Sequence, residues 1–195
     1  SAFGLGSPLG IDLHGEKPGL VPSPEWKKSA EPDDPMWRNG DTYNVSIGQG
    51  GMKPTPLQMA SLAAALANGG TLWQPYLLEV ARDAEGKLLE QKMPRAIRTG
   101  LVSAEALTPV IAGMRQTVTG GTARLLSEVP VAVAAKTGTA QSAPGKLPHA
   151  WVIALAPVEK PEVAVAVMVE YAGEGATVAV PITNEILKWY FAHRQ

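Results

Sequence analysis

Cysteine is absent from the 195-residue sequence, and histidine is scarce. Without cysteine the chain can form neither a disulfide framework nor a thiolate metal site. The absence is compatible with an oxidising, extracytoplasmic compartment but does not prove one. The three histidines, His14, His149 and His193, show no metal-ligand spacing, so the sequence predicts no metal role for them.

Long hydrophobic runs are also missing. The longest are W-V-I-A-L-A-P-V (residues 151–158) and A-V-A-V-M-V (residues 164–169), which have the length of strands and are too short to span a bilayer. The chain opens at S-A-F-G-L-G without an initiator methionine, and we interpret it as a fragment or a processed product. The lack of an anchor in this chain therefore leaves the anchoring of the full-length protein open.

Neither sign of charge dominates, because 17 basic and 18 acidic side chains give a net charge of −1. The chain thus lacks the basic footprint of a nucleic-acid-binding protein. Apolar residues make up 45% and charged residues 18% of the sequence, which is typical of a globular protein. The length suffices for one ordinary domain with a hydrophobic core.

The first quarter of the chain differs in composition from the rest. Residues 1–51 are rich in glycine, proline, aspartate and serine and show little periodicity, which predicts an irregular segment that packs on the domain. Trp26 and Trp37 are expected to anchor this segment through their large apolar surfaces. The acidic run E-P-D-D (residues 31–34) is interpreted as a solvated loop.

Hydrophobic periodicity and turn signals predict the elements of the remaining chain. The predicted helices cover residues 56–67, 104–118, 123–127 and 178–192, and the predicted strands cover residues 73–80, 87–92, 131–141, 150–156 and 163–171. The short links between the last three strands favour antiparallel neighbours. On the last helix, Ile182, Ile186 and Trp189 fall on one apolar stripe. The expected fold class is therefore α+β, with an antiparallel sheet covered by helices.

Two helix starts carry specific capping signals. Thr55 and Gln58 form a T-x-x-Q capping box around Pro56, which suits the first helical position. Ser103 is a possible cap for the next helix, but Pro109 lies inside its predicted range. This helix is expected either to kink at the proline or to start later, at Thr108.

The stretch A-A-K-T-G-T-A-Q (residues 134–141) carries the strongest chemical signal. The ammonium of Lys136 supplies positive charge and the hydroxyls of Thr137 and Thr139 supply directed donors, a combination that binds a carboxylate. Gly138 lacks a side chain, so another backbone can approach the strand closely. A backbone N–H of the same strand can face a developing oxyanion. A K-T-G triplet alone is more often a strand end with a solvated lysine and surface threonines.

The surrounding blocks decide between these interpretations. G-I-D-L-H-G-E, P-G-L-V-P-S-P-E-W-K, G-D-T-Y-N-V-S-I-G-Q-G, T-P-L-Q-M-A, G-G-T-A, A-A-K-T-G-T-A-Q and H-A-W-V-I-A-L-A-P follow one another in this order. Together they resemble the C-terminal part of the class B penicillin-binding protein transpeptidase domain, with an elongation-type peptidoglycan D,D-transpeptidase as the nearest likeness. The resemblance covers residues 1–195 and is weakest between residues 72 and 101. In it, residues 123–195 form a short helix, three strands and a final helix that carry K-T-G.

The resemblance implies a serine acyl-enzyme mechanism. The family's serine attacks the D-Ala–D-Ala bond of a peptidoglycan stem peptide, D-alanine leaves, and an amine of a neighbouring stem peptide completes the cross-link; β-lactams mimic the donor. Three motifs share the site, S-x-x-K, S-x-N and K-[ST]-G. No serine of this chain fits either of the first two. The chain contains no nucleophile and is expected to be inactive by itself.

The resemblance also assigns roles at the K-T-G strand. Lys136 helps to bind the donor carboxylate and tunes the protonation of the S-x-N serine, and the Thr137 and Thr139 hydroxyls contact that carboxylate. The Thr139 N–H supplies one half of the oxyanion hole. The strand edge, with Gly138 at its centre, accepts the substrate backbone as an added strand. His149, at the start of the next strand, is expected to support the motif structurally.

Asp41 and Gln49 flank the S-I-G-Q-G loop and are expected to fix it by hydrogen bonds. No cofactor or metal is implied. The implied partners are stem peptides, β-lactams and a membrane glycosyltransferase of the shape, elongation, division and sporulation type, and the implied location is the periplasmic face of the bacterial plasma membrane. Two alternatives remain open: a serine β-lactamase or carboxypeptidase of the same fold, and a non-catalytic β-lactam sensor or wall-binding module.

Overall fold

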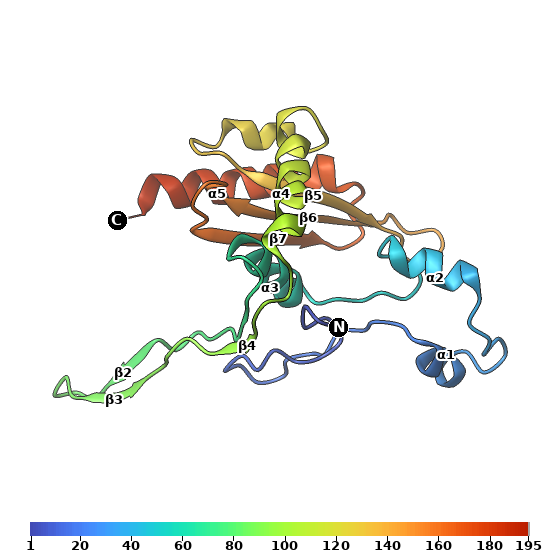
Figure 1. The fold of residues 1–195 in the computed structure, drawn as a ribbon, viewed down its shortest axis with the longest axis horizontal. Helices are drawn as coiled ribbons and strands as arrows, with labels where there is room; N and C mark the ends of the chain where they lie inside the picture. Colours follow the sequence, from blue (N-terminus) through green and yellow to red (C-terminus); the bar gives the residue numbers. More distant parts are fainter. Residues whose placement is uncertain (195) are drawn as a thin grey trace.

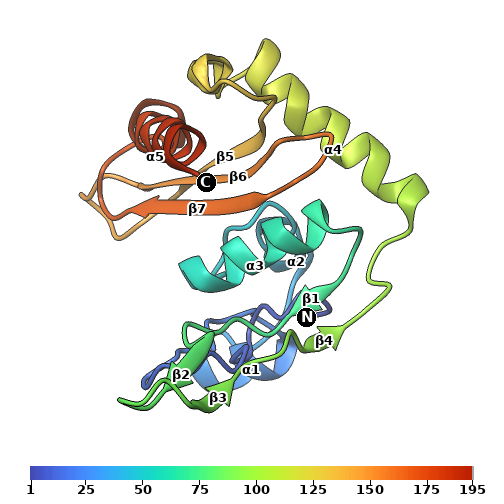
Figure 2. The same cartoon turned by 90° about the vertical axis from the view of Figure 1, so that its left-hand side faces the viewer.

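A three-stranded antiparallel sheet forms the centre of the computed structural model, which describes residues 1–194. Its strands β5 (Ala134–Ala140), β6 (His149–Ala156) and β7 (Val163–Val169) lie in the order β5-β6-β7. Helix α5 (Val180–His193) covers one face and α3 (Pro56–Ala67) the other, as Figures 1 and 2 show. This layered arrangement confirms the predicted α+β fold.

The remaining elements surround this sandwich. Helix α4 (Ala104–Thr119) packs against β5, and the 3₁₀ helix η1 (Arg124–Glu128) and the π-helical turn η2 (Gly175–Ala179) lie on the α5 side. Helices α1 (Pro24–Ala30) and α2 (Asn39–Ser46) precede α3. Within residues 1–194, no helix combines the length and the apolar composition that crossing a bilayer requires.

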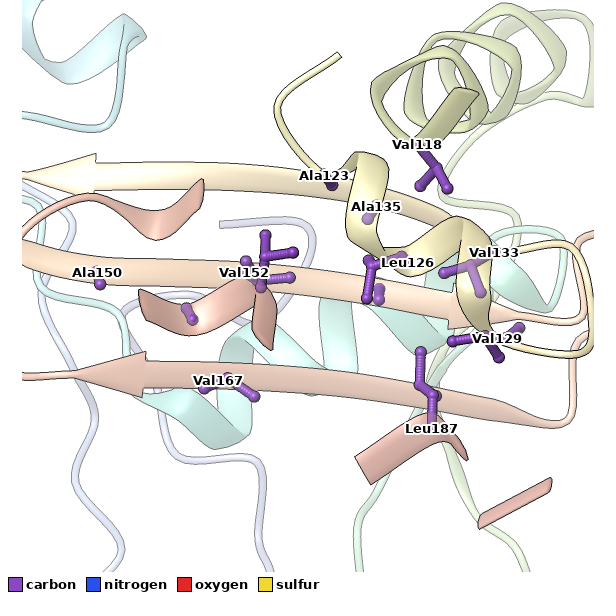
Figure 3. Close-up of a cluster of buried hydrophobic side chains, with 14 residues drawn as sticks. Val118, Ala123, Leu126, Val129, Val133, Ala135, Ala150, Val152, Val167 and Leu187 are labelled. Carbon is purple, nitrogen blue, oxygen red and sulfur yellow. The ribbon is translucent and has the colours of Figure 1, made fainter. Parts of the chain in front are cut away.

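Strand β5 separates two apolar clusters, because successive side chains of a strand point to opposite faces. Ala135 belongs to the larger cluster, in which Val118, Leu126, Val152 and other residues pack between the sheet, η1 and α5 (Figure 3). Ala134 belongs to a smaller cluster with Met114 of α4. Both alanines are fully buried, so the strand that carries the K-T-G motif is fixed from both faces.

The two predicted helix starts are confirmed in their details. Thr55 and Gln58 form the expected capping box, and Ser103 accepts a hydrogen bond from the Ala106 N–H. Helix α4 begins at residue 104 and contains Pro109 in its interior, so the later start at Thr108 is wrong. The Thr108 hydroxyl donates to the Ala104 carbonyl, which occupies one acceptor of the first turn.

The face that α5 buries differs from the expected stripe. Val180, Thr183 and Leu187 face the core, whereas Ile182, Ile186 and Trp189 are 41%, 42% and 65% exposed within the described chain. Thr183 is fully buried, and its hydroxyl donates to the Ala179 carbonyl at 2.8 Å, so its polar group has a partner inside the helix. Because Thr183 is polar, the hydrophobic pattern of the sequence did not indicate that the face with Val180 and Leu187 is the buried one.

The predicted strand over residues 73–80 is also wrong in its extent. Strand β1 (Leu72–Trp73) pairs with β4 (Ala96–Arg98), and only β2 (Val80–Arg82) pairs with β3 (Leu88–Gln91) across the D-A-E-G turn. The β2–β3 pair forms an arm that projects away from the sheet (Figure 1), whereas β1 packs against α3. Pro75, two residues after the end of β1, cannot donate to a continuous ladder.

The segment before α3 is more ordered than its composition indicates, because an ion cluster joins α1 to α2. The Lys27 side chain is only 5% exposed, and its Nζ donates to both carboxylate oxygens of Asp41 at 2.9 and 2.8 Å. Glu31 and Asp34 lie 3.8 and 3.9 Å from the same nitrogen. These two acids are therefore partners of a buried lysine, which corrects the interpretation of residues 31–34 as a merely solvated loop.

We predict that Asp41→Asn weakens the protein at neutral pH but not in acid. Hydrogen bonds from Lys27 and from the Arg38 N–H lower the pKa of Asp41 below its ordinary value of 3.8. The carboxylate therefore contributes stability that is complete above that value and is lost as the pH falls through the lower folded-state pKa. The urea midpoint of Asp41→Asn should lie below that of the wild type at neutral pH, and the two midpoints should converge at low pH. Asp33→Asn, an exposed control, should have the wild-type midpoint at every pH.

Candidate active site at the outer edge of strand β5

One edge of β5 pairs with β6, and the other edge has no strand neighbour within residues 1–194. Backbone groups of a strand point alternately to its two edges. The Ala132 carbonyl accepts from Val158, beyond the end of β6, whereas the Val133 and Thr139 carbonyls accept from side chains outside the sheet. The peptide groups of Thr137 and Thr139 therefore face the open outer edge.

Lys136 lies at this edge with its charge accessible. The side chain is exposed, and its Nζ donates to the carbonyl of Thr137, on the outer edge. It takes part in no ion pair with any carboxylate of the described chain. An ammonium without a carboxylate partner at an open strand edge is available to an anionic ligand.

Both hydroxyls of the motif are held by neighbouring segments. The Thr137 and Thr122 hydroxyls lie 2.8 Å apart, and the Thr139 hydroxyl accepts from the Gly175 N–H at 3.4 Å. Thr122 belongs to the G-G-T-A block between α4 and η1. This block contributed to the family resemblance, but Thr122 was not predicted to be a site residue. The position of Thr122, three residues after the end of α4, does not indicate a contact with the motif strand.

Gly138 lies where backbones come close together. A Cβ on Gly138 would lie 3.2 Å from the Cβ of Trp151, and a Cβ on Gly175 would lie 2.5 Å from the Gly138 carbonyl oxygen. The η2 turn thus packs directly on the motif strand, and it brings the Gly175 N–H to Thr139. The missing side chain of Gly175 allows η2 to approach β5, and the missing side chain of Gly138 keeps the strand clear of Trp151.

His149 begins β6 and pairs with Ala140 at the end of β5. Its Nδ1 accepts from the Tyr171 N–H at 3.2 Å, so the ring proton is on Nε2 in the neutral form. The two rings lie 4.6 Å apart, and the Lys146 Nζ is 4.3 Å from the Tyr171 ring centroid. His149 therefore fixes the chain just after β7 to the start of β6, the strand that pairs with β5. No group of residues in the described part of the chain could hold a metal ion.

The S-I-G-Q-G loop reaches the same edge, whereas Asp41 does not. The Gln49 side chain donates to the Thr139 carbonyl at 3.2 Å and accepts from the Gln141 N–H at 3.3 Å. Asp41 lies on α2 and binds Lys27 instead. The site therefore combines a cation, hydroxyls and an outward N–H, which together can bind a peptide carboxylate and polarise a carbonyl.

An antiparallel sheet between helices, with K-T-G on its open edge strand, defines the class of domains that bind penicillin at such an edge. The chain belongs to the penicillin-binding protein transpeptidase domain family, whose family model matches residues 1–188.

Relatives and solved structures agree with this assignment. The chain is 34% identical over 212 residues to the peptidoglycan D,D-transpeptidase MrdA of Salmonella typhimurium, an alignment that covers 98% of the chain and 33% of that protein. The crystal structure of Pseudomonas aeruginosa PBP2 in complex with WCK 5153 is 35% identical, with a TM-score of 0.77 over 97% of this chain and 42% of that one. The chain thus spans about a third of the length of its curated relatives.

Two further structures show such domains in functional states. Penicillin-binding protein A of M. tuberculosis, in a ceftriaxone acyl-enzyme complex, is 28% identical, with a TM-score of 0.81 over 96% of this chain and 41% of that one. A chain of a peptidoglycan synthase complex that coordinates polymerization and crosslinking is 34% identical, with a TM-score of 0.80 over 99% of this chain and 32% of that one.

We predict that Thr122→Val in the full-length protein weakens the binding of a carboxylate-bearing penicillin. The valine keeps the shape of threonine but removes the hydroxyl that orients Thr137, which costs about 1 kcal/mol, or roughly a fivefold loss of affinity. Thr119→Val is the matched control, because the Thr119 hydroxyl donates to the Gln116 carbonyl within the last turn of α4 and does not contact the motif strand. Equal affinities of the two variants, measured by competition with a fluorescent penicillin, would argue against this role of Thr122.

Gly175→Ala is expected to destabilise the protein by about 1–3 kcal/mol, because the new methyl group overlaps the backbone of Gly138 and forces η2 away from β5. Gly113→Ala on helix α4 is the control, since no atom lies within 4 Å of its added methyl group. In thermal unfolding the control should match the wild type or exceed it, because alanine favours helices. A Gly175→Ala protein as stable as the control would refute the close packing of η2 on β5.

Proposed function

We propose that the full-length protein is a serine D,D-transpeptidase that cross-links peptidoglycan stem peptides, and that this chain supplies the K-T-G half of its active site. The observation that carries the proposal is the unpaired outer edge of β5, where the exposed Lys136 ammonium lies beside Thr137 and the outward N–H of Thr139. The family assignment and the names of the relatives support it.

In the proposed mechanism, the terminal carboxylate of a D-Ala–D-Ala donor binds the Lys136 ammonium and the hydroxyls of Thr137 and Thr139. The donor backbone adds to the edge of β5 as a short strand. Its scissile carbonyl oxygen then faces the Thr139 N–H, which stabilises the negative charge that develops during attack. Binding the carboxylate and the carbonyl at two fixed points orients the bond for attack.

The nucleophile of this mechanism belongs to motifs that the chain does not contain. A serine of an S-x-x-K motif attacks the carbonyl carbon, the peptide bond breaks, and the proton of the serine hydroxyl passes to the amine of the leaving D-alanine. The amine of a second stem peptide then attacks the acyl-enzyme and releases the serine. A β-lactam follows the first step alone and remains attached. By itself the present chain can bind the carboxylate and stabilise the oxyanion, but it contains no serine that could be acylated.

The location and partners of the full-length protein follow from the same proposal. Peptidoglycan is cross-linked outside the plasma membrane, so we place the domain on the periplasmic face, held by an anchor elsewhere in the full-length protein. A membrane glycosyltransferase of the shape, elongation, division and sporulation type is the proposed partner, supported by the similar chain of a peptidoglycan synthase complex. We propose an elongation role rather than a division role, as the resemblance of the sequence blocks implies.

Fluorescent penicillin labelling of the full-length protein tests this function. We predict a stable covalent label on the wild type, and a loss of labelling rate of about tenfold or more in Lys136→Ala, because a charge-assisted contact to the carboxylate disappears. Lys160→Ala, on the exposed β6–β7 turn, removes the same charge far from the motif and should label normally.

Each other outcome identifies an alternative. Rapid release of the label would indicate a β-lactamase, and a complete lack of label on the wild type would indicate a non-catalytic module. Equal labelling of the two lysine variants would exclude Lys136 from the site.

A further inference from the structure

The loop that joins α2 to α3 projects one side chain onto the motif strand from 90 positions away in the sequence. Gly50 has a left-handed φ of 62°, and a Cβ at this position would lie only 2.7 Å from the Cβ of Asn44 on α2. The loop therefore turns sharply against its own helix. Gln49, directly before this turn, extends its amide to the outer edge of β5.

The Gln49 amide replaces one residue of a neighbouring strand. Its Nε2 donates to the Thr139 carbonyl at 3.2 Å, and its Oε1 accepts from the Gln141 N–H at 3.3 Å. A residue of a parallel strand bonds the same pair of groups, the carbonyl of residue i and the N–H of residue i+2. The open edge of β5 therefore ends at Thr139, because the next outward groups are already bonded.

Arg115 closes the opposite end of the same edge. Its Nη1 donates to the Val133 carbonyl at 3.0 Å, and Ala135, the next outward residue, is fully buried. Between the two side chains the edge offers the N–H groups of Thr137 and Thr139, together with the Thr137 carbonyl, which accepts from the Lys136 Nζ. A stretch of this length fits the end of a peptide rather than a chain that runs through in both directions.

Thr139 is held at every polar group except this N–H. Its carbonyl accepts from Gln49, its hydroxyl accepts from the Gly175 N–H at 3.4 Å, and its neighbour Ala140 pairs with His149 of β6. Gln49 is the contact that restrains the outer side of the strand at this point. Its loss would leave the peptide groups around Thr139 free to rotate away from the reacting carbonyl.

We propose that Gln49 is a positioning residue for acylation, which fixes the Thr139 N–H toward the reacting carbonyl and ends the substrate groove at that N–H. This inference rests on the proposed function, in which that N–H stabilises the oxyanion. Lys136 and Thr137, two of the three carboxylate contacts, do not contact Gln49, and the third, the Thr139 hydroxyl, is held by the Gly175 N–H rather than by Gln49. Loss of the Gln49 amide should therefore slow the chemical step and leave the preceding binding step nearly unchanged.

Gln49→Glu isolates the amide, because glutamate has the shape of glutamine but lacks the N–H₂ donor. A carboxylate oxygen would face the Thr139 carbonyl and repel it, while the acceptor for Gln141 remains. Gln141→Glu is the matched control, since it adds the same charge two residues from Thr139 on an exposed side chain. Any difference between the two variants therefore reports the bond to Thr139 rather than the added charge.

The experiment measures acylation of the full-length protein by a fluorescent penicillin over a range of concentrations, which separates the acylation rate constant from the Kd of the preceding complex. Gln49→Glu should lower the rate constant by about tenfold or more, because a displaced oxyanion donor loses much of its effect. Its Kd should change by less than about threefold, since the carboxylate contacts remain. Gln141→Glu carries the added charge but keeps the bond to Thr139, so its rate constant should exceed that of Gln49→Glu by about tenfold or more.

The inference is overturned if Gln49→Glu acylates like the wild type, if both variants lose the same amount, or if only the Kd rises. Gln49→Met, which removes both hydrogen bonds without adding charge, should reproduce the lower rate constant. If circular dichroism shows that neither variant folds, Gln49 is a folding determinant and the positioning role is refuted. A wild-type protein that does not acylate at all refutes the proposed function instead, so the two failures can be distinguished.

Discussion

The structure depends on a strand that is buried on both faces and unpaired along one edge. Ala134 and Ala135 fix β5 between two apolar clusters, yet its outward backbone groups lack a partner strand in the described chain. Unpaired backbone groups in such a place are costly and invite unspecific strand pairing. Side chains from α4 and from the S-I-G-Q-G loop bond the two ends of the edge, and only its middle stays open.

Distant segments contribute to this edge because each is fixed in turn by a polar contact. Lys27 joins α1 to α2 through Asp41, and the loop that follows α2 reaches β5. The buried Gln58 donates from α3 to the carbonyls of Gly4, Ser7 and Pro18 and so attaches the first residues of the chain to that helix. The glycine- and proline-rich first quarter is thus part of the architecture of the edge.

Local signals in the sequence predicted most elements, and longer-range contacts account for the errors. The capping box at Thr55 and the apolar runs of β6 and β7 determine structure within a few residues, so the helix start and the two strands could be predicted from the sequence. The buried face of α5 could not, because Thr183 packs as a small residue while its polarity argues against burial. Lys136 stood out by its chemistry, whereas Thr122 and the reach of Gln49 depend on loops that only the folded chain brings to β5.

The projecting arm has a consequence for handling the polypeptide. Leu77 and Leu89 are each 65% exposed in the described chain, and Met93 is 73% exposed. Apolar side chains gathered on a thin two-stranded ribbon favour self-association and give proteases an accessible substrate. Recombinant preparations of the chain by itself are therefore expected to need dilute, detergent-containing buffers, and limited digestion should cut first near residues 83–86, where the ribbon turns.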